Sequence, residues 1–255
     1  MKLVTLMENT SCREDLCFEH GLSLYLETGD QRILFDAGQT GAFAENAVTL
    51  GVDLENVDFA VLSHGHYDHS GGLKRFLEIN KAAPVYVSNW AFEPHWESDG
   101  RYVGVDQTLK EHHRIRYVAA QTSLNKGITL YRMDRGPMDT AGLLVEEDGV
   151  RKPDDFRHEQ YLLLEENGRK ILISGCSHKG ILNIMDAFCP DVLVGGFHFM
   201  KMEDESFLRS AAEKLLEYDT VYYTGHCTGL KQYALLKNLM GDRLHYISTG
   251  TILEI

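Results

Sequence analysis

The 255-residue sequence predicts an α/β fold, and three observations support this prediction. Short stretches near the N-terminus, at residues 1–7, 22–27 and 31–35, alternate or run apolar as β-strands do. After residue 178, helical segments alternate with strand-like segments, which is typical of β–α units. Between these parts, the apolar run from Phe59 to Leu62 indicates a buried strand that leads directly into a group of polar side chains.

The individual elements follow from local patterns. The second and third strands are joined by Thr28-Gly29-Asp30, which is a turn signal. Helices are expected over residues 40–50, 73–79, 179–188, 204–217 and 229–240. Further strands are expected over residues 57–62, 84–88, 127–132, 141–147, 159–165, 169–174, 191–195, 220–224, 244–248 and 251–254. Asn167-Gly168 predicts a hairpin turn between two of them.

The segment from residue 89 to residue 122 is different, because it mixes aromatic residues, histidines and charges without a sustained period. In a compact domain, so long an irregular segment is usually a lid or a binding loop. A surface insertion packed by its own aromatic side chains explains the composition equally well. The chain has no repeat, no low-complexity tract and only five prolines, so we expect one domain, residues 1–255, with a lid-like insertion at about 89–122.

The charge balance limits the partners that the chain can have. The formal net charge is −13, from 25 Lys and Arg against 38 Asp and Glu. This balance argues against nucleic acid as a partner, because non-specific binding to nucleic acid needs a positive surface. A small anionic substrate is still compatible with it, because bound metal ions reverse the local field.

Composition also indicates the compartment. No apolar run approaches the ~20 residues that span a bilayer, and the N-terminus lacks the features of a signal peptide. The five cysteines are odd in number and include no C-x-x-C pair, so reduced thiols are a better interpretation than a disulfide framework. We therefore expect a soluble, cytoplasmic protein that does not bind membranes.

The strongest chemical signal is the group of potential metal ligands that follows Leu62. It consists of His64, His66, Asp68 and His69. Neutral imidazole nitrogens and a carboxylate oxygen suit divalent ions such as Zn²⁺, Mn²⁺ or Fe²⁺. The spacing allows His64 and His66 to bind one ion while Asp68 and His69 bind a second, so a solvated polar loop is the weaker interpretation.

Two later strands also end in metal-competent groups. The stretch Ile171 to Ser174 leads through Gly175 to Cys176 and His178, and the stretch Val221 to Thr224 leads through Gly225 to His226. We predict that His178 and His226 complete the metal site. Cys176 is either a thiolate ligand or a small buried apolar residue, and the second interpretation is slightly favoured.

A third strand, Asp191 to Val194, leads to His198. This histidine is a substrate contact, a ligand or a packing residue.

The motif from His64 to Gly72 resembles the H-x-H-x-D-H signature of the metallo-β-lactamase superfamily. This resemblance implies a four-layer αββα sandwich, in which two mixed sheets are covered by helices on both outer faces and metals bind at one edge. The two halves of the chain, each mixing strands and helices, fit such a sandwich. The superfamily usually has a metal-bridging aspartate where this sequence has Cys176 or His178.

Several shorter phrases resemble a narrower branch, the 7,8-dihydropterin-6-methyl-4-(β-D-ribofuranosyl)aminobenzene-5′-phosphate synthase-like proteins. They include Glu19-His20-Gly21, Phe35-Asp36-Ala37-Gly38, Asp154-Asp155-Phe156 with Glu159, Gly175-Cys176-Ser177-His178 and Gly225-His226-Cys227. The resemblance favours a place for His20 beside the metals, as a proton donor or as a support for a ligand. Asp36, Asp155 and Glu159 are candidates for carboxylates that orient ligand histidines, although Asp36 equally suits a helix cap.

These observations favour a metal-dependent hydrolase that acts on a small, phosphorylated or heterocyclic substrate. Two divalent ions, expected to be zinc with manganese, iron or magnesium as alternatives, would make water reactive at neutral pH. Asp68 would orient that water, with His20 and His198 as further catalytic candidates. The alternative is a pterin-condensing synthase on the same site. A di-iron redox protein is less favoured because it normally needs a flavin partner domain, and a non-catalytic metal scaffold is the weakest hypothesis.

Overall fold

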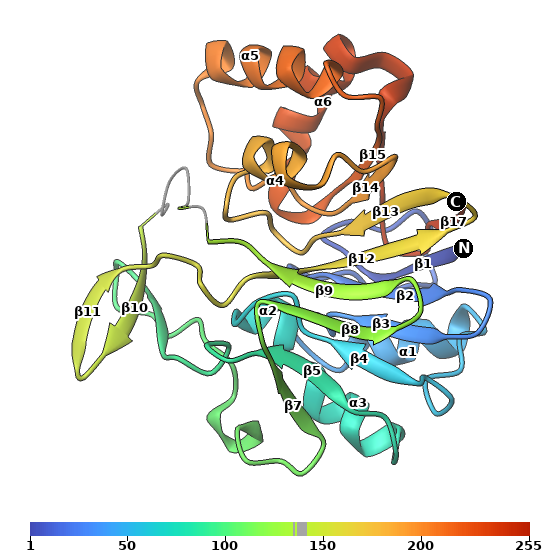
Figure 1. Cartoon of the computed structure of the whole chain (residues 1–255), viewed down its shortest axis with the longest axis vertical. Coiled ribbons are helices and arrows are strands. Elements are labelled where there is room, and N and C mark those ends of the chain that lie inside the picture. The colour runs from blue at the N-terminus through green and yellow to red at the C-terminus, as the bar shows by residue number, and fades with distance from the viewer. Residues whose placement is uncertain (135, 137–141) are drawn as a thin grey trace.

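The computed structural model describes residues 1–134, 136 and 142–255, and two large sheets lie at its centre (Figure 1). Each of these two sheets has seven strands. In spatial order, the first sheet consists of β17 (Ile252–Glu254), β1 (Lys2–Met7), β2 (Ser23–Glu27), β3 (Arg32–Phe35), β4 (Phe59–Val61), β5 (Val85–Ser88) and β7 (Ile115–Val118). The second consists of β16 (Leu244–Tyr246), β15 (Val221–Thr224), β14 (Val192–Val194), β13 (Arg169–Ile173), β12 (Gln160–Glu166), β9 (Ile128–Arg132) and β8 (Gln121–Asn125).

Both sheets are mixed in the same way. One half of each is antiparallel, whereas β3, β4, β5 and β7 in the first sheet, and β13, β14, β15 and β16 in the second, are parallel. The carboxyl ends of parallel strands meet at one edge of a sheet, where ligands usually bind in such folds. The loops that follow β4, β13, β14 and β15 are therefore well placed to build a common site.

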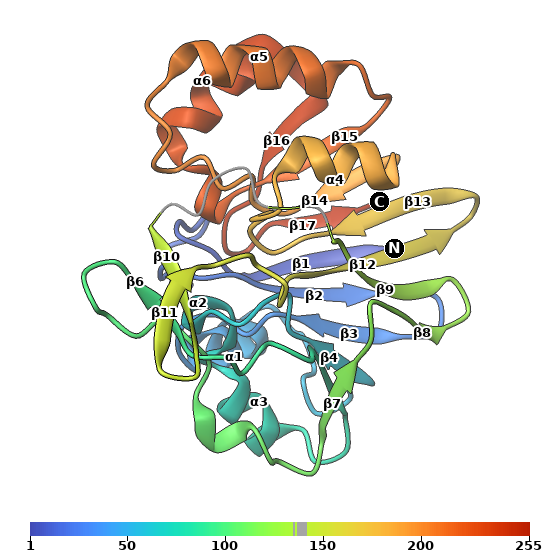
Figure 2. The ribbon, with the colours of Figure 1, turned by 60° about the vertical axis from the view of Figure 1, so that its left-hand side comes forward.

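Helices cover the outer face of each sheet (Figure 2). The first sheet is covered by α1 (Ala42–Thr49) and α3 (Leu73–Ile79), and the second by α4 (Ile181–Phe188), α5 (Glu205–Leu216) and α6 (Leu230–Met240). Short helical turns are α2 (Tyr67–Ser70), η1 (Gln107–Leu109), η2 (His226–Thr228) and η3 (Gly241–Arg243). Within the described residues, no helix is both long and apolar enough to cross a membrane.

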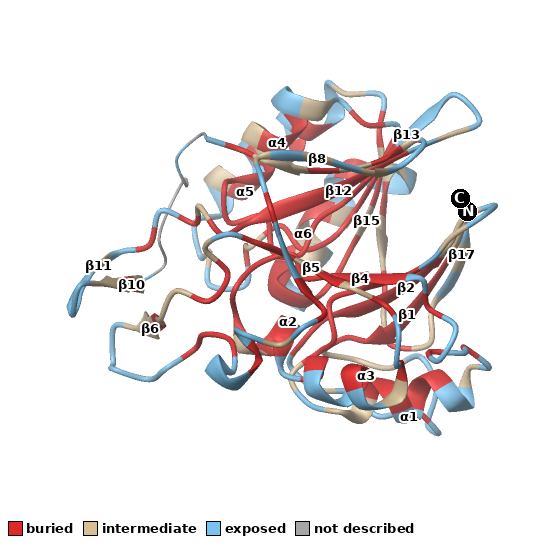
Figure 3. Cartoon of the chain, turned by 60° about the horizontal axis from the view of Figure 1, so that its bottom comes forward, coloured by how far each residue is buried: buried red, intermediate tan, exposed pale blue. Residues whose placement is uncertain are grey.

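Three apolar clusters hold these layers together, and Figure 3 shows the buried strands between the helices. Alternation along a strand divides its side chains between two clusters, as in β1, where Leu3 faces the other sheet and Val4 faces the helices. The central cluster joins Phe35 and Val61 of the first sheet to Leu162 and Ile173 of the second. The predicted four-layer αββα sandwich is confirmed.

The segment predicted as an irregular insertion contains regular structure. Residues 89–122 include β6 (His95–Glu97) and β7, and β8 begins at residue 121. β7 is part of the first large sheet and β8 is part of the second. β6 instead pairs with β10 (Leu143–Glu147), which pairs with β11 (Val150–Pro153) in a small separate sheet. Local periodicity does not reveal β6 and β7, because their partners β10 and β5 lie far from them along the chain, whereas β8 forms a hairpin with the adjacent β9. The strand predicted over 141–147 begins at a residue that lies outside the described part.

Candidate metal centre

The predicted metal ligands lie in loops at the carboxyl ends of parallel strands from both sheets. The loop after β4 carries His64, His66, Asp68 and His69, the loop after β13 carries Cys176 and His178, and those after β14 and β15 carry His198 and His226. The side chains of the six residues predicted as ligands are all buried and adjacent to one another. The fold thus gathers side chains that are more than one hundred residues apart in the sequence.

The first group of ligand candidates is His64, His66 and His178, whose ring centroids lie 4.7–5.0 Å apart. Ser63 Oγ donates to Asp36 Oδ2 at 2.7 Å, so the 2.7 Å contact of His64 Nδ1 with Ser63 Oγ requires the proton on Nδ1. His64 Nε2 therefore carries a lone pair. It is buried without a hydrogen-bond partner among the described residues, as are His66 Nε2 and both ring nitrogens of His178.

The second group is Asp68, His69 and His226. His69 Nδ1 donates to Asp36 Oδ2 at 2.6 Å, and His226 Nδ1 donates to Asn9 Oδ1 at 2.9 Å, so in the neutral rings both Nε2 atoms carry lone pairs. These two Nε2 atoms are 3.1 Å apart, and Asp68 Oδ2 lies 3.3 Å from that of His226. Acceptors that face one another in a buried site need a cation between them, so this donor set fits a bound metal ion.

Cys176 lies where the two groups meet. Its Sγ is 3.2 Å from His69 Nε2, and it also lies within 4.8 Å of ligand atoms of His64 and His178. The same sulfur approaches a ligand atom of His198 and the sulfur of Cys227 within that distance. Burial, and then the neighbouring Cys227, raise the pKa of the Cys176 thiol well above its ordinary value of 9.0.

His198 lies beside the first group, with its ring centroid 4.2 Å from that of His178. His20 lies beside the second. Its side chain is 46% exposed, and its Nε2 is 3.2 Å from Asp68 Oδ2. Asn9 Nδ2 is 3.3 Å from His20 Nδ1, and donation along this contact leaves the proton of His20 on Nε2, where it can be given to Asp68. Asn9 therefore orients both His20 and His226.

Asp36 supports both groups of ligands. It is buried, and besides the contacts with His69 Nδ1 and Ser63 Oγ, its Oδ1 accepts the backbone N–H of Ser63 at 2.7 Å. The sequence also allowed Asp36 to cap a helix. The structure places its carboxylate against the ligand loop, where it fixes the tautomers of His64 and His69.

The other two predicted carboxylates are placed differently from each other. Glu159 is buried and accepts the backbone N–H groups of His178 at 2.7 Å and Lys179 at 2.9 Å, so it fixes the loop that carries His178. Asp155 is exposed, and its Oδ1 accepts the backbone N–H of Arg157 at 3.0 Å. It is the neighbouring Asp154 that contacts histidines.

Sequence reasoning missed several supporting residues. Glu8 is fully buried, accepts the backbone N–H of His226 at 2.5 Å and accepts the hydroxyl of Tyr246 at 2.8 Å. Glu8 and Asn9 directly follow the apolar first strand, which is the signal that identified the other ligand loops. His95, Asp154 and His158 form a further buried group next to His66.

Burial sets the charge state of the first group. Desolvation, the largest cause, holds the pKa values of His64, His66 and His178 well below the ordinary value of 6.5, so these imidazoles are neutral at neutral pH. Burial alone would raise the pKa of Asp68. The neighbouring histidines, His69 first among them, lower that pKa well below 3.8, so Asp68 is a carboxylate. Both states are those that metal ligands require.

The backbone is strained at these loops. Positive φ angles occur at several residues that are not glycine, including Asp36 (59°), Phe156 (51°), Ser177 (60°), His198 (58°) and His226 (50°). Each such residue costs of order 1–3 kcal/mol, and such residues cluster at functional sites. The ring of Phe156 stacks on that of His178 with 4.3 Å between centroids, so one strained residue directly supports another loop of the site.

A cavity of about 580 Å³ opens over the two groups. Its floor includes His66, Asp68, Cys176, His178 and His226. One wall is apolar and is formed by Phe197, Phe199, Met202 and Phe207. Two cationic side chains, Arg101 and Lys201, also line the cavity. The volume is in the range that binds small molecules.

Comparison with known proteins gives consistent results. Residues 18–226 match the sequence family described as the Metallo-beta-lactamase superfamily. Uncharacterized protein MJ0448 of Methanocaldococcus jannaschii is 31% identical, over 98% of both chains. The 7,8-dihydropterin-6-methyl-4-(beta-D-ribofuranosyl)-aminobenzene-5'-phosphate synthase of the same organism is 26% identical, over 100% of this chain and 96% of the synthase. The crystal structure of Tm1679, described as a metal-dependent hydrolase of the beta-lactamase superfamily, has a TM-score of 0.85 and 28% identity, and the match covers 100% of this chain and 99% of the other.

Proposed function

Because the chain belongs to the metallo-β-lactamase superfamily, we propose that it is a metal-dependent hydrolase of a small, phosphorylated or heterocyclic molecule. The observation that carries this proposal is the convergence of unprotonated acceptors beneath the cavity. His69 Nε2, His226 Nε2 and Asp68 Oδ2 face one another at 3.1–3.8 Å, and the thiol of Cys176 lies 3.2 Å from His69 Nε2. Such a set is stable when it holds a cation.

Two ions would be held by the two groups of ligands. His64, His66 and His178 would hold the first and Asp68, His69 and His226 the second, with Cys176 between them. Imidazole and thiolate ligands favour zinc, although manganese and iron are compatible with the histidine-rich groups. When bound, such ions lower the pKa of water and polarise the bond that is attacked.

The protein's own side chains would then position water and move protons. Asp68 accepts the Nε2 proton of His20, so the pair lies ready to orient water at the floor of the cavity. After taking up a second proton from solvent, the half-exposed His20 can give one to a leaving group and return to the neutral ring. His198, beside His178, faces the same cavity and is suited to contact the substrate.

The walls of the cavity support the proposed class of substrate. Phe197, Phe199 and Phe207 offer apolar surface to a flat ring, while Arg101 and Lys201 offer positive charge to a phosphate. Arg101 is already paired with Glu97 at 2.8 Å, and Lys201 is exposed, so Lys201 is the more available of the two cations. An exchange of Lys201 for alanine should raise KM for phosphorylated substrates more than for neutral ones.

The test is a screen of the purified chain after loading with zinc or manganese. Phosphomonoesters, phosphodiesters, lactones, thioesters and amides are offered, and metal content is measured in the same samples. We expect hydrolysis of at least one class, and we expect a chelator to abolish it. His66→Ala should also abolish this activity, whereas His113→Ala, which removes an exposed imidazole, should retain it. A fully metal-loaded protein that hydrolyses none of these classes would refute the proposal.

A pterin-condensing synthase is the second candidate, and the relationship to the dihydropterin ribofuranosylaminobenzene phosphate synthase over the whole chain favours it. The aromatic wall and the cationic side chains suit a pterin and a phosphate equally well. Mass spectrometry separates the two candidates. A dihydropterin diphosphate incubated with β-ribofuranosylaminobenzene 5′-phosphate should give a joined product and pyrophosphate in the synthase case, and separate products in the hydrolase case.

A further inference from the structure

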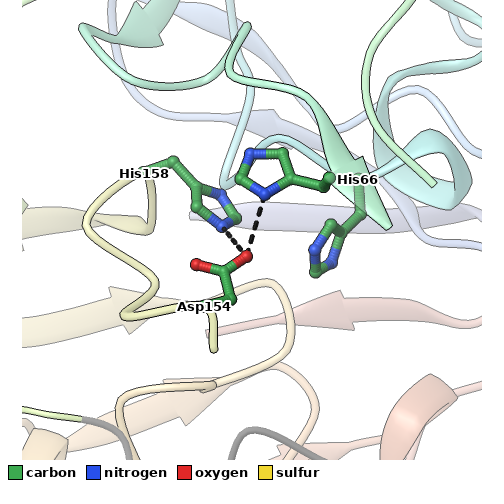
Figure 4. Close-up of side chains that lie close together, drawn as sticks. His66, Asp154 and His158 are labelled. Atoms are coloured by element: carbon green, nitrogen blue, oxygen red, sulfur yellow. Dashed lines mark hydrogen bonds and ion pairs between the residues drawn. The ribbon is translucent and has the colours of Figure 1, made fainter. Parts of the chain in front are cut away.

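A third group of side chains, which includes two more histidines, lies behind His66 and outside the six predicted ligands. It consists of His95 from β6 and of Asp154 and His158 from the segment between β11 and β12, all of them buried. His95 Nδ1 lies 2.8 Å from Asp154 Oδ2, and His158 Nε2 lies 3.2 Å from the same oxygen. Figure 4 shows Asp154 and His158 facing each other beside His66.

The backbone fixes the tautomer of His158. The N–H of Gly65, between His64 and His66, donates to His158 Nδ1 at 2.8 Å, so this nitrogen must carry a lone pair. The proton of the neutral ring is then on Nε2, where it is donated to Asp154. Because its Nε2 is protonated, His158 is not available as a metal ligand through that atom.

Asp154 fixes the tautomer of His95 in turn. Its carboxylate can only accept, so the contact with His95 Nδ1 requires a proton on that atom. The other carboxylate oxygen accepts the backbone N–H of Phe156 at 2.7 Å, which holds Asp154 in place. His95 Nε2 is therefore left with a lone pair.

The unpaired nitrogens of His95 and His66 complement each other. Both Nε2 atoms are buried and find no hydrogen-bond partner in the described part of the chain, and the two rings lie edge to face with centroids 5.5 Å apart. A Cβ on Gly65 would lie 3.1 Å from His95 Nε2, so His95 reaches the ligand loop itself. A proton on His66 Nε2, directed at the lone pair of His95 directly or through one water, satisfies both atoms.

We propose that Asp154 and His95 are positioning residues for His66, which they hold in the tautomer that leaves Nδ1 unprotonated for the metal. This proposal rests on the proposed metal site but not on the reaction that occurs there. It gives the small sheet that contains β6 a role beyond bordering the cavity. A ligand histidine whose other nitrogen is held in this way binds its metal more tightly, typically by about 10–100-fold.

The first test is the tautomeric state of the unmodified protein, measured by long-range ¹H–¹⁵N NMR correlation with and without zinc. Signals are assigned with single histidine variants. We expect a proton on Nδ1 of His95 and on Nε2 of His158 in both samples, and zinc on Nδ1 of His66 in the loaded one. A proton on Nε2 of His95, or zinc on Nε2 of His66, would overturn the proposal.

The second test is zinc affinity, measured by competition with a chelator, together with zinc stoichiometry. Asp154→Asn should bind zinc about 10–100-fold more weakly, because the amide can donate to His95 Nδ1 and so reverse its tautomer. Asp148→Asn makes the same chemical change at an exposed turn and should leave the affinity unchanged. Unchanged affinity in Asp154→Asn would contradict the inference.

Variants of His95 provide a rescue. His95→Gln retains an acceptor for the proton of His66 and should keep affinity within about threefold of the original, whereas His95→Leu should lose about tenfold or more. Circular dichroism checks that each variant is folded. A third zinc ion that is present in the original protein and missing from His95→Leu would mean that this group binds metal itself, which would overturn the positioning role. No substrate is needed, so an inactive protein can still support this inference and an active one can still refute it.

Discussion

Because His158 is buried, we expect the metal-free protein to lose stability in mild acid. Burial, the largest cause, lowers the pKa of His158 to about 4, whereas an unfolded histidine has a pKa near 6.5. Between pH 6.5 and pH 4 the unfolded chain therefore binds one more proton than the folded chain. The free energy of unfolding falls by about 1.4 kcal/mol per pH unit over this interval, or about 3 kcal/mol in all, and the loss ends below pH 4.

The other histidines of the site contribute in both directions. The pKa values of His64, His66 and His178 are also lowered by burial, so they steepen the loss. Despite burial, Asp36 raises the pKa of His69. The stabilisation that comes from the raised pKa of His69 is present at low pH and is lost as the pH rises. It therefore offsets part of the stability that the other histidines lose in acid.

The contribution of His158 is isolated by comparing variants in urea unfolding of the metal-free protein between pH 7.5 and pH 4.5. His158→Asn keeps an acceptor near the N–H of Gly65 and should reduce the slope by about 1.4 kcal/mol per pH unit, the effect of one proton. His113→Asn, at an exposed histidine, should leave the slope unchanged. Equal slopes in the original protein and His158→Asn would refute the reasoning.

Three further changes test the contacts of the metal centre. Asp36→Asn should weaken zinc binding by about 10–100-fold in a chelator competition assay, because the amide cannot accept all the protons that the carboxylate accepts around His69. Gly65→Ala should destabilise the metal-free fold by about 2 kcal/mol and lower Tm by about 4–8 °C, because its Cβ would lie 2.3 Å from the carbonyl oxygen of Ala91. Cys176→Ala should reduce the zinc retained per chain after dialysis, measured by elemental analysis, because the ligand proposed to lie between the two groups is lost.

Each of these changes has a matched control. Asp148→Asn and Cys189→Ala alter exposed residues, and Gly29→Ala adds a Cβ with no atom within 4 Å. If Gly65→Ala has the same Tm as Gly29→Ala, the close approach to Ala91 is not rigid. If Cys176→Ala retains as much zinc as Cys189→Ala, the thiol is a packing residue. Normal zinc affinity in Asp36→Asn would mean that the ligands keep their tautomers without help.

The sequence predicted the elements whose signal is local. The apolar run before His64 and the helices of the C-terminal part depend on periodicity within one element, and the structure places them within a few residues of their predicted bounds. The loops that carry His178 and His226 were found because buried strands end in metal-competent groups. Each of these patterns lies within one short segment of the chain.

The sequence could not predict contacts made between distant segments. β6 and β7 lack a clear pattern because their partners lie in other parts of the chain. Asp155 was a candidate whereas its neighbour Asp154 faces the histidines, and only the turn before β12 decides which of the two points inward. Glu8 and Asn9 were overlooked because no histidine accompanies them in the sequence.

The contact of Glu8 with His226 joins positions 218 residues apart, and β1 pairs with the C-terminal strand β17. During translation, the first strand leaves the ribosome long before the loop that it braces has been made. A nascent chain that ends before residue 226 has the candidate ligands from His64 to His69 but lacks His226, the candidate that completes the second group. We therefore expect ribosome-bound chains stalled before residue 226 to take up zinc far more weakly than released ones.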